Sequence, residues 1–153
     1  DPRKGTWDHA HAWIDEQLPV GDDVYLYYGG YARGHKVNRF EERQIGLVRM
    51  KRDRYVARQA ESTPGMLRTV SFRFKGSALT VNADASAGSV RAQALDADGK
   101  PISGFSFDDC APISQDALDA PIDWRSDTAK LADRVVILEF SVVQAKLFGF
   151  AIK

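Results

Sequence analysis

Apolar and polar residues alternate along several short stretches of the chain, and this alternation predicts β-strands. Residues 24–28 are strongly β-prone and place Val24, Leu26 and Tyr28 on one face. Residues 67–74 alternate in a similar way. Helical periodicity is almost absent. The pattern therefore predicts an all-β protein with short strands at the spacing typical of a β-sandwich.

The C-terminal stretch contains two apolar runs, residues 135–143 and 147–152, which are separated only by residues 144–146. This spacing predicts a β-hairpin. In the first run both alternating sets of positions carry apolar residues, a pattern typical of a strand inside a packed two-sheet structure. We therefore expect the first run to be a central strand.

The residue pattern of the N-terminal region predicts a meander of three or four antiparallel strands. Trp7, His9, His11 and Trp13 occur at every second position, so a strand would place all four on one face. Such a face would be polar and partly buried, with a metal bound by the two histidines as the alternative. Further strands are expected at residues 24–28, 45–50 and 55–57.

Glycine and proline positions divide the chain further. Gly29 and Gly30 predict the end of a strand, and the Ser-Thr-Pro-Gly segment at residues 62–65 predicts a domain boundary. The Asp-Gly pair within residues 96–101 predicts a tight hairpin turn. We expect residues 1–62 to form an antiparallel, blade-like meander and residues 66–153 a jelly-roll-like β-sandwich. Its strands are expected at residues 67–74, 78–83, 88–95, 102–107, 121–125, 135–143 and 147–152.

Composition narrows the range of partners. The 153 residues include 21 basic and 21 acidic side chains, so there is no basic field to attract nucleic acid or an anionic membrane surface. No apolar run approaches the ~20 residues that a membrane-spanning helix needs. The single cysteine, Cys110, excludes an internal disulfide and is expected to be a small buried apolar residue. The first residues contain neither an initiator methionine nor a signal sequence, which favours a fragment.

Several motifs, taken in order, resemble a known family of carbohydrate-active enzymes. Those in the first part are Trp7-Asp8, residues 22–31 (DDVYLYYGGY), residues 34–36 (GHK) and residues 45–47 (IGL). They resemble the final blade of the five-bladed β-propeller in family-43-like and family-32-like glycoside hydrolases. Those in the second part are residues 79–84, 88–90, 95–102, 104–106, 109–110, 123–124 and 147–150, and they resemble the sandwich that follows such a propeller.

This resemblance implies a carbohydrate ligand and an extracellular or periplasmic location. It also argues against a complete active site, because these enzymes need five blades and this chain has residues for one. Most glycosidases require two carboxylates that face each other across the scissile bond. In the family these carboxylates come mostly from earlier blades, so we expect no catalytic residues in this chain.

The resemblance names five candidate ligand-contacting residues: Trp7, Asp8, Tyr31, His35 and Trp124. Each has a structural alternative. An Asp at this position is more often a turn or backbone-capping group, and His35 is more often a surface-loop histidine. The tyrosine could pack against neighbouring strands, and Trp124 could be a core residue of a short strand.

A loop rich in aspartate is the candidate metal site. Asp108, Asp109 and Asp116 fall in this loop, and their oxygen atoms are the ligand type that calcium prefers. The hypothesis is a structural calcium ion, and the alternative is a solvated acidic loop.

These observations lead to one functional hypothesis and two rivals. The hypothesis is the noncatalytic C-terminal portion of a glycoside-hydrolase-like protein, with a structural or glycan-contacting sandwich. The rivals are an independent carbohydrate-binding module and an assembly module without a ligand. A single blade leaves two unpaired edges, so we expect a homo-oligomer or contacts with the remainder of a longer chain, unless the sandwich covers the blade.

Overall fold

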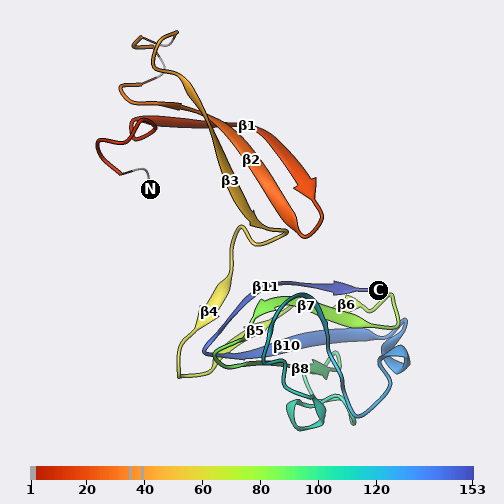
Figure 1. Ribbon diagram of the computed structural model, residues 1–153. Helices are drawn as coiled ribbons and strands as arrows, with labels where there is room; N and C mark the ends of the chain where they lie inside the picture. Colours follow the sequence, from red (N-terminus) through yellow and green to blue (C-terminus); the bar gives the residue numbers. More distant parts are fainter. Residues whose placement is uncertain (1–2, 35, 39) are drawn as a thin grey trace. The chain divides into compact units, whose positions relative to one another are not determined.

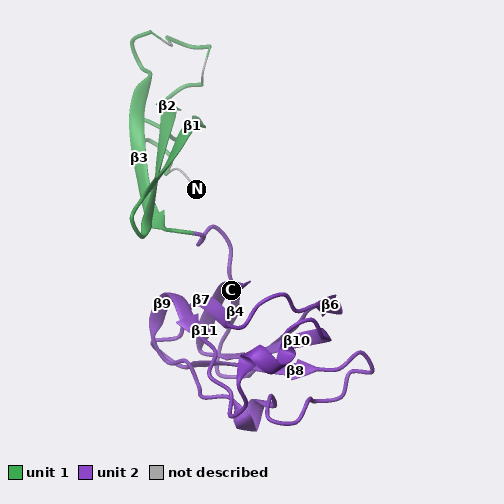
Figure 2. Cartoon of the chain, turned by 90° about the vertical axis from the view of Figure 1, so that its right-hand side faces the viewer, with its two compact units in different colours: residues 1–52 green, residues 53–153 purple. Residues whose placement is uncertain are grey.

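The computed structural model of the chain describes residues 3–34, 36–38 and 40–153. The chain divides into two units, Asp1–Arg52 (unit 1) and Asp53–Lys153 (unit 2), which Figure 2 colours separately. All strand pairs of the described residues are antiparallel. The helical segments among these residues are two 3-10 turns, Phe107–Asp109 and Thr128–Leu131. The all-β prediction is therefore confirmed.

Unit 1 is a three-stranded meander, as the sequence predicts. Its strands are β1 (His11–Val20), β2 (Asp23–Tyr31) and β3 (Gln44–Lys51), with β2 in the middle (Figure 1). Gly21 and Asp22 form the two-residue loop between β1 and β2. The φ angle of Gly21 is 59°, a left-handed conformation that glycine adopts without steric cost.

The N-terminal aromatic and histidine residues do not share one strand face, so this prediction is wrong. β1 begins at His11 and therefore includes Trp13 but neither Trp7 nor His9. The preceding segment is held in a turn, because both the backbone N–H and the ring Nδ1 of His9 contact the carbonyl oxygen of Thr6. These local hydrogen bonds replace the extended conformation that the alternation predicted.

The predicted end of β2 at its two glycines is also wrong, since the strand continues through both. A Cβ atom on Gly30 would lie 2.3 Å from Cζ3 of Trp7, and one on Gly29 would lie 3.2 Å from Nε of Arg43. The glycines therefore give room to side chains that cross the strand.

Unit 2 contains two four-stranded antiparallel sheets. The first has the order β4-β11-β7-β9, and in the second β10 pairs with β5 and β6 along one edge and with β8 along the other. The strands are β4 (Arg58–Ala60), β5 (Gly65–Arg68), β6 (Phe72–Arg73), β7 (Leu79–Asp84), β8 (Ser89–Leu95), β9 (Asp116–Pro121), β10 (Val135–Val143) and β11 (Ala145–Ile152). Since β4 pairs with β11, residues 58–60 belong to this unit and not to the meander. Residues 55–57 form no strand. The jelly-roll topology stays a prediction.

The core of unit 2 lies between its two sheets. On β10 the alternate residues Val136, Leu138, Phe140 and Val142 are buried, and the residues between them are more exposed. β7 contributes Leu79, Val81 and Ala83 from the other sheet. β10 is therefore the central strand that the sequence predicts, although only one of its faces is buried.

The predicted hairpin of β10 and β11 is wrong, because the chain changes sheets between the two strands. β10 pairs with β8, while β11 pairs with β7 and β4. Gln144, at φ 44°, forms the corner, and its N–H donates to the carbonyl oxygen of Glu61 at 2.9 Å. Both Val142 and Ala145 are buried, so the inner face of one sheet continues into the inner face of the other.

The predicted turn at residues 96–101 is confirmed. Gly99 has a φ of 79°, and the N–H of Asp96 donates to the carbonyl oxygen of Lys100 at 2.9 Å. Residues 102–107 form turns instead of the predicted strand, and the strand predicted at residues 121–125 is replaced by β9, which lies earlier. In these segments the backbone groups form hydrogen bonds in turns, and such turns cannot be predicted from alternation alone.

The buried position of Phe140 predicts a large cost of truncation. Phe140 is fully buried, so Phe140→Ala should lower the free energy of unfolding of unit 2 by about 3–5 kcal/mol. Val70 is 83% exposed, so Val70→Ala should change it by less than about 0.5 kcal/mol. Guanidinium unfolding followed by circular dichroism measures both, and equal effects would contradict the assignment of the core.

Candidate functional site: an exposed apolar sheet face

One face of the unit 1 sheet carries large apolar side chains that are exposed. We call it the Trp13 face, and it consists of Trp13, Leu18, Tyr27, Ile45 and Leu47. Side chains of directly paired residues point to the same side of an antiparallel sheet. Trp13 and Ile45 flank the same glycine of β2, and Leu47 pairs with Tyr27. Trp13 is 60% exposed, Ile45 76% and Leu47 50%, so the outer strands β1 and β3 expose large apolar side chains on this side, and the Arg43 guanidinium lies over the glycine between Trp13 and Ile45.

A β-bulge in β1 is needed to assemble this face. Trp13 and Leu18 are five positions apart and would point to opposite sides of a regular strand. The register shifts between Ile14 and Glu16, which leaves Asp15 as the extra residue. The bulge therefore returns Leu18 to the side of Trp13.

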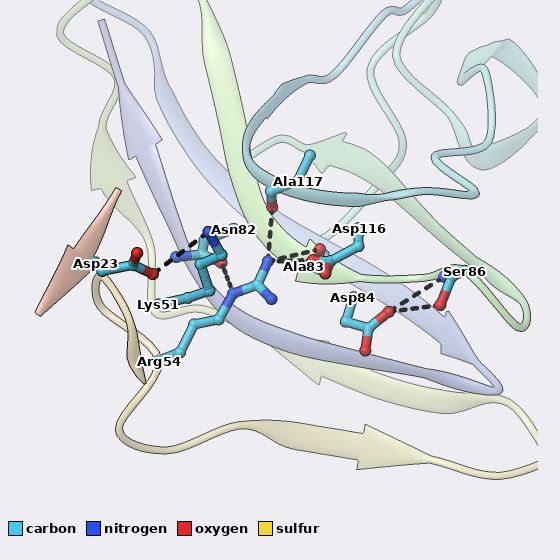
Figure 3. Close-up of polar contacts among 9 residues, drawn as sticks. All are labelled: Asp23, Lys51, Arg54, Asn82, Ala83, Asp84, Ser86, Asp116 and Ala117. Carbon is cyan, nitrogen blue, oxygen red and sulfur yellow. Dashed lines mark hydrogen bonds and ion pairs between the residues drawn. The ribbon is translucent and has the colours of Figure 1, made fainter. Parts of the chain in front are cut away.

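Ion pairs hold β2 and β3 together at one end of the sheet. Oδ2 of Asp23 accepts from Nη2 of Arg49 at 2.5 Å, and Oδ1 lies 3.4 Å from Nζ of Lys51, the latter pair drawn in Figure 3. The hydrogen bond from Arg49 is the main cause that lowers the pKa of Asp23 below its ordinary value of 3.8. These contacts fix the register of the strands that form the Trp13 face.

An aromatic stack covers part of the opposite face of the sheet, on which Ile14 and Val48 stay exposed. The rings of Trp7 and Tyr28 are 5.7 Å apart and inclined by 15°. Glycines beneath both rings make this stack possible. A Cβ atom on Gly46 would lie 2.2 Å from Cζ of Tyr28, and one on Gly30 would clash with the Trp7 ring in the same way. Trp7 is thus a half-buried packing residue that covers its own sheet.

The carboxylate of Asp8 accepts hydrogen bonds within unit 1. Its Oδ2 accepts from the Tyr28 hydroxyl and its Oδ1 from the Thr6 hydroxyl, both at 2.8 Å. These bonds, that from Tyr28 first, lower the pKa of Asp8 below 3.8, and the same contact raises the pKa of Tyr28 above 10.0. The carboxylate therefore anchors the turn before β1, in agreement with the structural alternative.

Tyr31, a further candidate, lies on the same side of the sheet as Trp13 but is buried. Tyr31 is 8% exposed, and its ring packs 5.7 Å from the ring of His11. His35 lies outside the described residues, so its predicted role stays a prediction.

Trp124 is a core residue, so the prediction of an exposed aromatic platform is wrong at this position. Its indole Nε1 donates to the carbonyl oxygen of Ala92 at 2.8 Å, and its ring meets Phe105 edge-on at 5.4 Å. Cys110 is buried next to it in a backbone bridge, and burial raises the pKa of its thiol. Both residues fill the interior of unit 2.

The three aspartates of the predicted calcium site do not form one. Asp109 accepts from the backbone N–H and hydroxyl of Ser106, which lowers its pKa below 3.8, whereas Asp108 is exposed. Asp116 lies on β9 and pairs with Arg54. Across the described residues, no group of three or more histidine, cysteine, aspartate or glutamate side chains is placed to hold a metal ion.

Arg54 organises a polar cluster of unit 2, and the sequence pattern did not identify it. Its guanidinium donates to Oδ1 of Asn82 at 2.8 Å, to Oδ1 of Asp116 at 2.5 Å and to the carbonyl oxygens of Ala83 and Ala117 (Figure 3). It also lies over an aromatic ring of β11, 4.7 Å from the centroid. Arg54 therefore ties the first segment of unit 2 to strands far away in the sequence.

Comparison with known proteins returned no match to a family model, a curated protein or a solved structure. The resemblance to propeller glycosidases therefore rests on the quoted motifs alone. Within the described residues, no helix has the length and apolar character needed to cross a membrane.

The contact between Tyr28 and Asp8 predicts a change in acid titration. Tyr28→Phe keeps the aromatic stack and removes the hydroxyl donor, so the pKa of Asp8 should rise toward 3.8. A folded-state pKa below the unfolded value stabilises unit 1 above about pH 3.8, and this stabilisation is lost as the pH falls through the folded-state pKa. Tyr28→Phe should therefore make unit 1 less sensitive to acid.

Carbon-13 NMR of the Asp8 carboxyl group measures this effect directly. Tyr25→Phe is the matched control, because Tyr25 points to the Trp13 face and makes no hydrogen bond to Asp8. An unchanged pKa of Asp8 in Tyr28→Phe would show that the hydroxyl contact is absent in solution.

The Arg54 cluster predicts a stability effect. Arg54→Ala leaves several backbone and side-chain acceptors without a donor and should cost about 2–3 kcal/mol of unfolding free energy in unit 2. Arg54→Lys retains the charge but not the planar fork and should recover only part of this loss. Arg134→Ala, at an exposed position, should cost less than about 0.5 kcal/mol in the same denaturation assay. An equally small cost for Arg54→Ala would contradict the anchoring role.

Proposed function

We propose that this chain is a noncatalytic assembly part of a glycoside-hydrolase-like protein, in which the Trp13 face packs against another protein surface. In the purified chain, a second copy takes the place of that surface. The single observation that carries the proposal is the exposure of large apolar side chains on all three strands of unit 1.

The energetics of a small sheet support an assembly role. A three-stranded sheet needs a covered apolar face to be stable, and continuous exposed apolar patches on proteins are typical of interaction sites. The free edges of β1 and β3, which have no strand partner among the described residues, add backbone groups that a protein partner can pair. A partner protein can cover the apolar face and also pair with a free strand edge.

The carbohydrate-active part of the proposal derives from the motifs in the sequence. Two features support a noncatalytic role within such a protein. Both carboxylate oxygens of Asp8, which belongs to the Trp7-Asp8 motif, are used in hydrogen bonds of the turn. Trp124 and Tyr31 are buried and offer no platform for a sugar ring.

The oligomeric state tests the proposal. At micromolar concentration, size-exclusion chromatography with light scattering should show a dimer or a larger species. The double variant Ile45→Glu, Leu47→Glu places two charges on the Trp13 face, and its mass should fall by about half or more, to that of the monomer.

A matched double variant controls for added charge. Val56 and Val70 are exposed apolar residues of unit 2, so Val56→Glu with Val70→Glu should leave the oligomer intact. A monomer in the unmodified chain, or equal dissociation of both double variants, would contradict the proposal.

A carbohydrate-binding module is the second candidate, and the exposure of Trp13 favours it. Trp13 is 60% exposed, and Tyr27 on the same face is 36% exposed, so their rings could form a stacking surface for a polysaccharide. Affinity electrophoresis in polysaccharide gels distinguishes the candidates. Retardation that is lost in Trp13→Ala, in a chain that is monomeric, would support sugar binding over assembly.

A further inference from the structure

Unit 2 has a tapered cleft between the edges of its two sheets. The cleft has a volume of ≈ 400 Å³ and is lined by β4, β5 and Val142 of β10. β4 is the edge of one sheet and β5 lies at the edge of the other, and a short turn connects the two strands (Figure 1). Two strand edges without a strand partner among the described residues therefore face a common opening.

The cleft is closed at one end and open at the other. A Cβ atom on Gly65 would lie 3.0 Å from Cβ of Ala60, so β4 and β5 nearly touch next to the turn. Gly65 and Leu67 are paired with buried residues of β10, which places both on the inner side of their sheet. The narrow end and one wall are consequently apolar.

The positively charged side chain of Arg58 lies at the wide end of the cleft. Arg58 is paired with the buried Leu147, so its side chain starts on the same inner side as that of Ala60, two positions along β4. Arg58 is exposed, and its guanidinium has neither a hydrogen bond nor an ion pair with any residue that the structure describes. Arg68, by contrast, points to the outer side and donates to Oε1 of Glu139 at 2.6 Å.

We propose that this cleft binds an extended peptide segment in which an aliphatic residue and a carboxylate are two positions apart. The aliphatic side chain packs against Leu67 on the apolar wall, and the carboxylate pairs with Arg58. Residues i and i+2 of a strand point to the same side and are about 7 Å apart, as Ala60 and Arg58 are placed on β4. Charge complementarity with Arg58 selects the carboxylate, and the free strand edges select a peptide, because they can pair with its backbone.

Two synthetic peptides of seven residues test this inference on the full chain. One has a central leucine with glutamates two positions away on either side, which makes the test independent of strand direction. The other has lysines in place of the glutamates. Amide chemical shifts measured by NMR should show that the glutamate peptide binds residues 58–60 and 65–68 at least about tenfold more tightly than the lysine peptide.

Charge reversal provides the decisive variant. Arg58→Glu should lower the affinity for the glutamate peptide by about tenfold or more and raise the affinity for the lysine peptide. Lys75→Glu makes the same charge change at an exposed position outside the cleft and should leave both affinities unchanged. Absence of shifts at about 1 mM peptide, equal binding of both peptides, or no effect of Arg58→Glu would each overturn the proposal. The outcome is independent of the Trp13 face, because the cleft lies entirely within unit 2.

Discussion

A thin sheet has two faces whose apolar side chains gain stability when they are covered, and unit 1 covers only part of one face with its own side chains. The Trp7 and Tyr28 rings stack over one face, and glycines at 30 and 46 leave the space beneath them. The other face presents Trp13 and Ile45 to solvent. Burial of apolar surface stabilises proteins by roughly 25 cal/mol per Å², so the uncovered face is a favourable site for association. The proposed assembly function follows from these uncovered side chains.

Unit 2 meets the same requirement within its own chain. Its two sheets bury each other's inner faces, with Phe140 on β10 and Leu79 on β7 among the fully buried residues. The Arg54 cluster then attaches the first residues of the unit to β7 and β9. Among the surfaces left open is the cleft between β4 and β5 with Arg58 at its opening. The two units therefore offer partners different surfaces: a broad apolar sheet face and a narrow groove with one cation.

Alternation along the chain was sufficient to predict the all-β class and the central position of β10, and the Asp-Gly pair predicted the turn at Gly99. It failed where a contact distant in sequence decides the local structure. The corner at Gln144 depends on which sheet accepts each strand, and the bulge at Asp15 adds a residue that periodicity cannot reveal. Trp124 and Arg54 gain their roles from partners 32 and 28 or more positions away, so residue type alone did not separate a buried ring or an anchoring cation from a ligand-binding one.

The concentration dependence of thiol labelling at position 45 tests the central claim most directly. Ile45→Cys places a thiol on the Trp13 face, Val70→Cys places one at an exposed site of unit 2, and the native Cys110 is buried and reacts slowly. If copies of the chain cover the Trp13 face, maleimide labelling at position 45 slows as protein concentration rises, while labelling at position 70 does not change. Equal labelling rates at position 45 from nanomolar to high micromolar concentration would contradict the account.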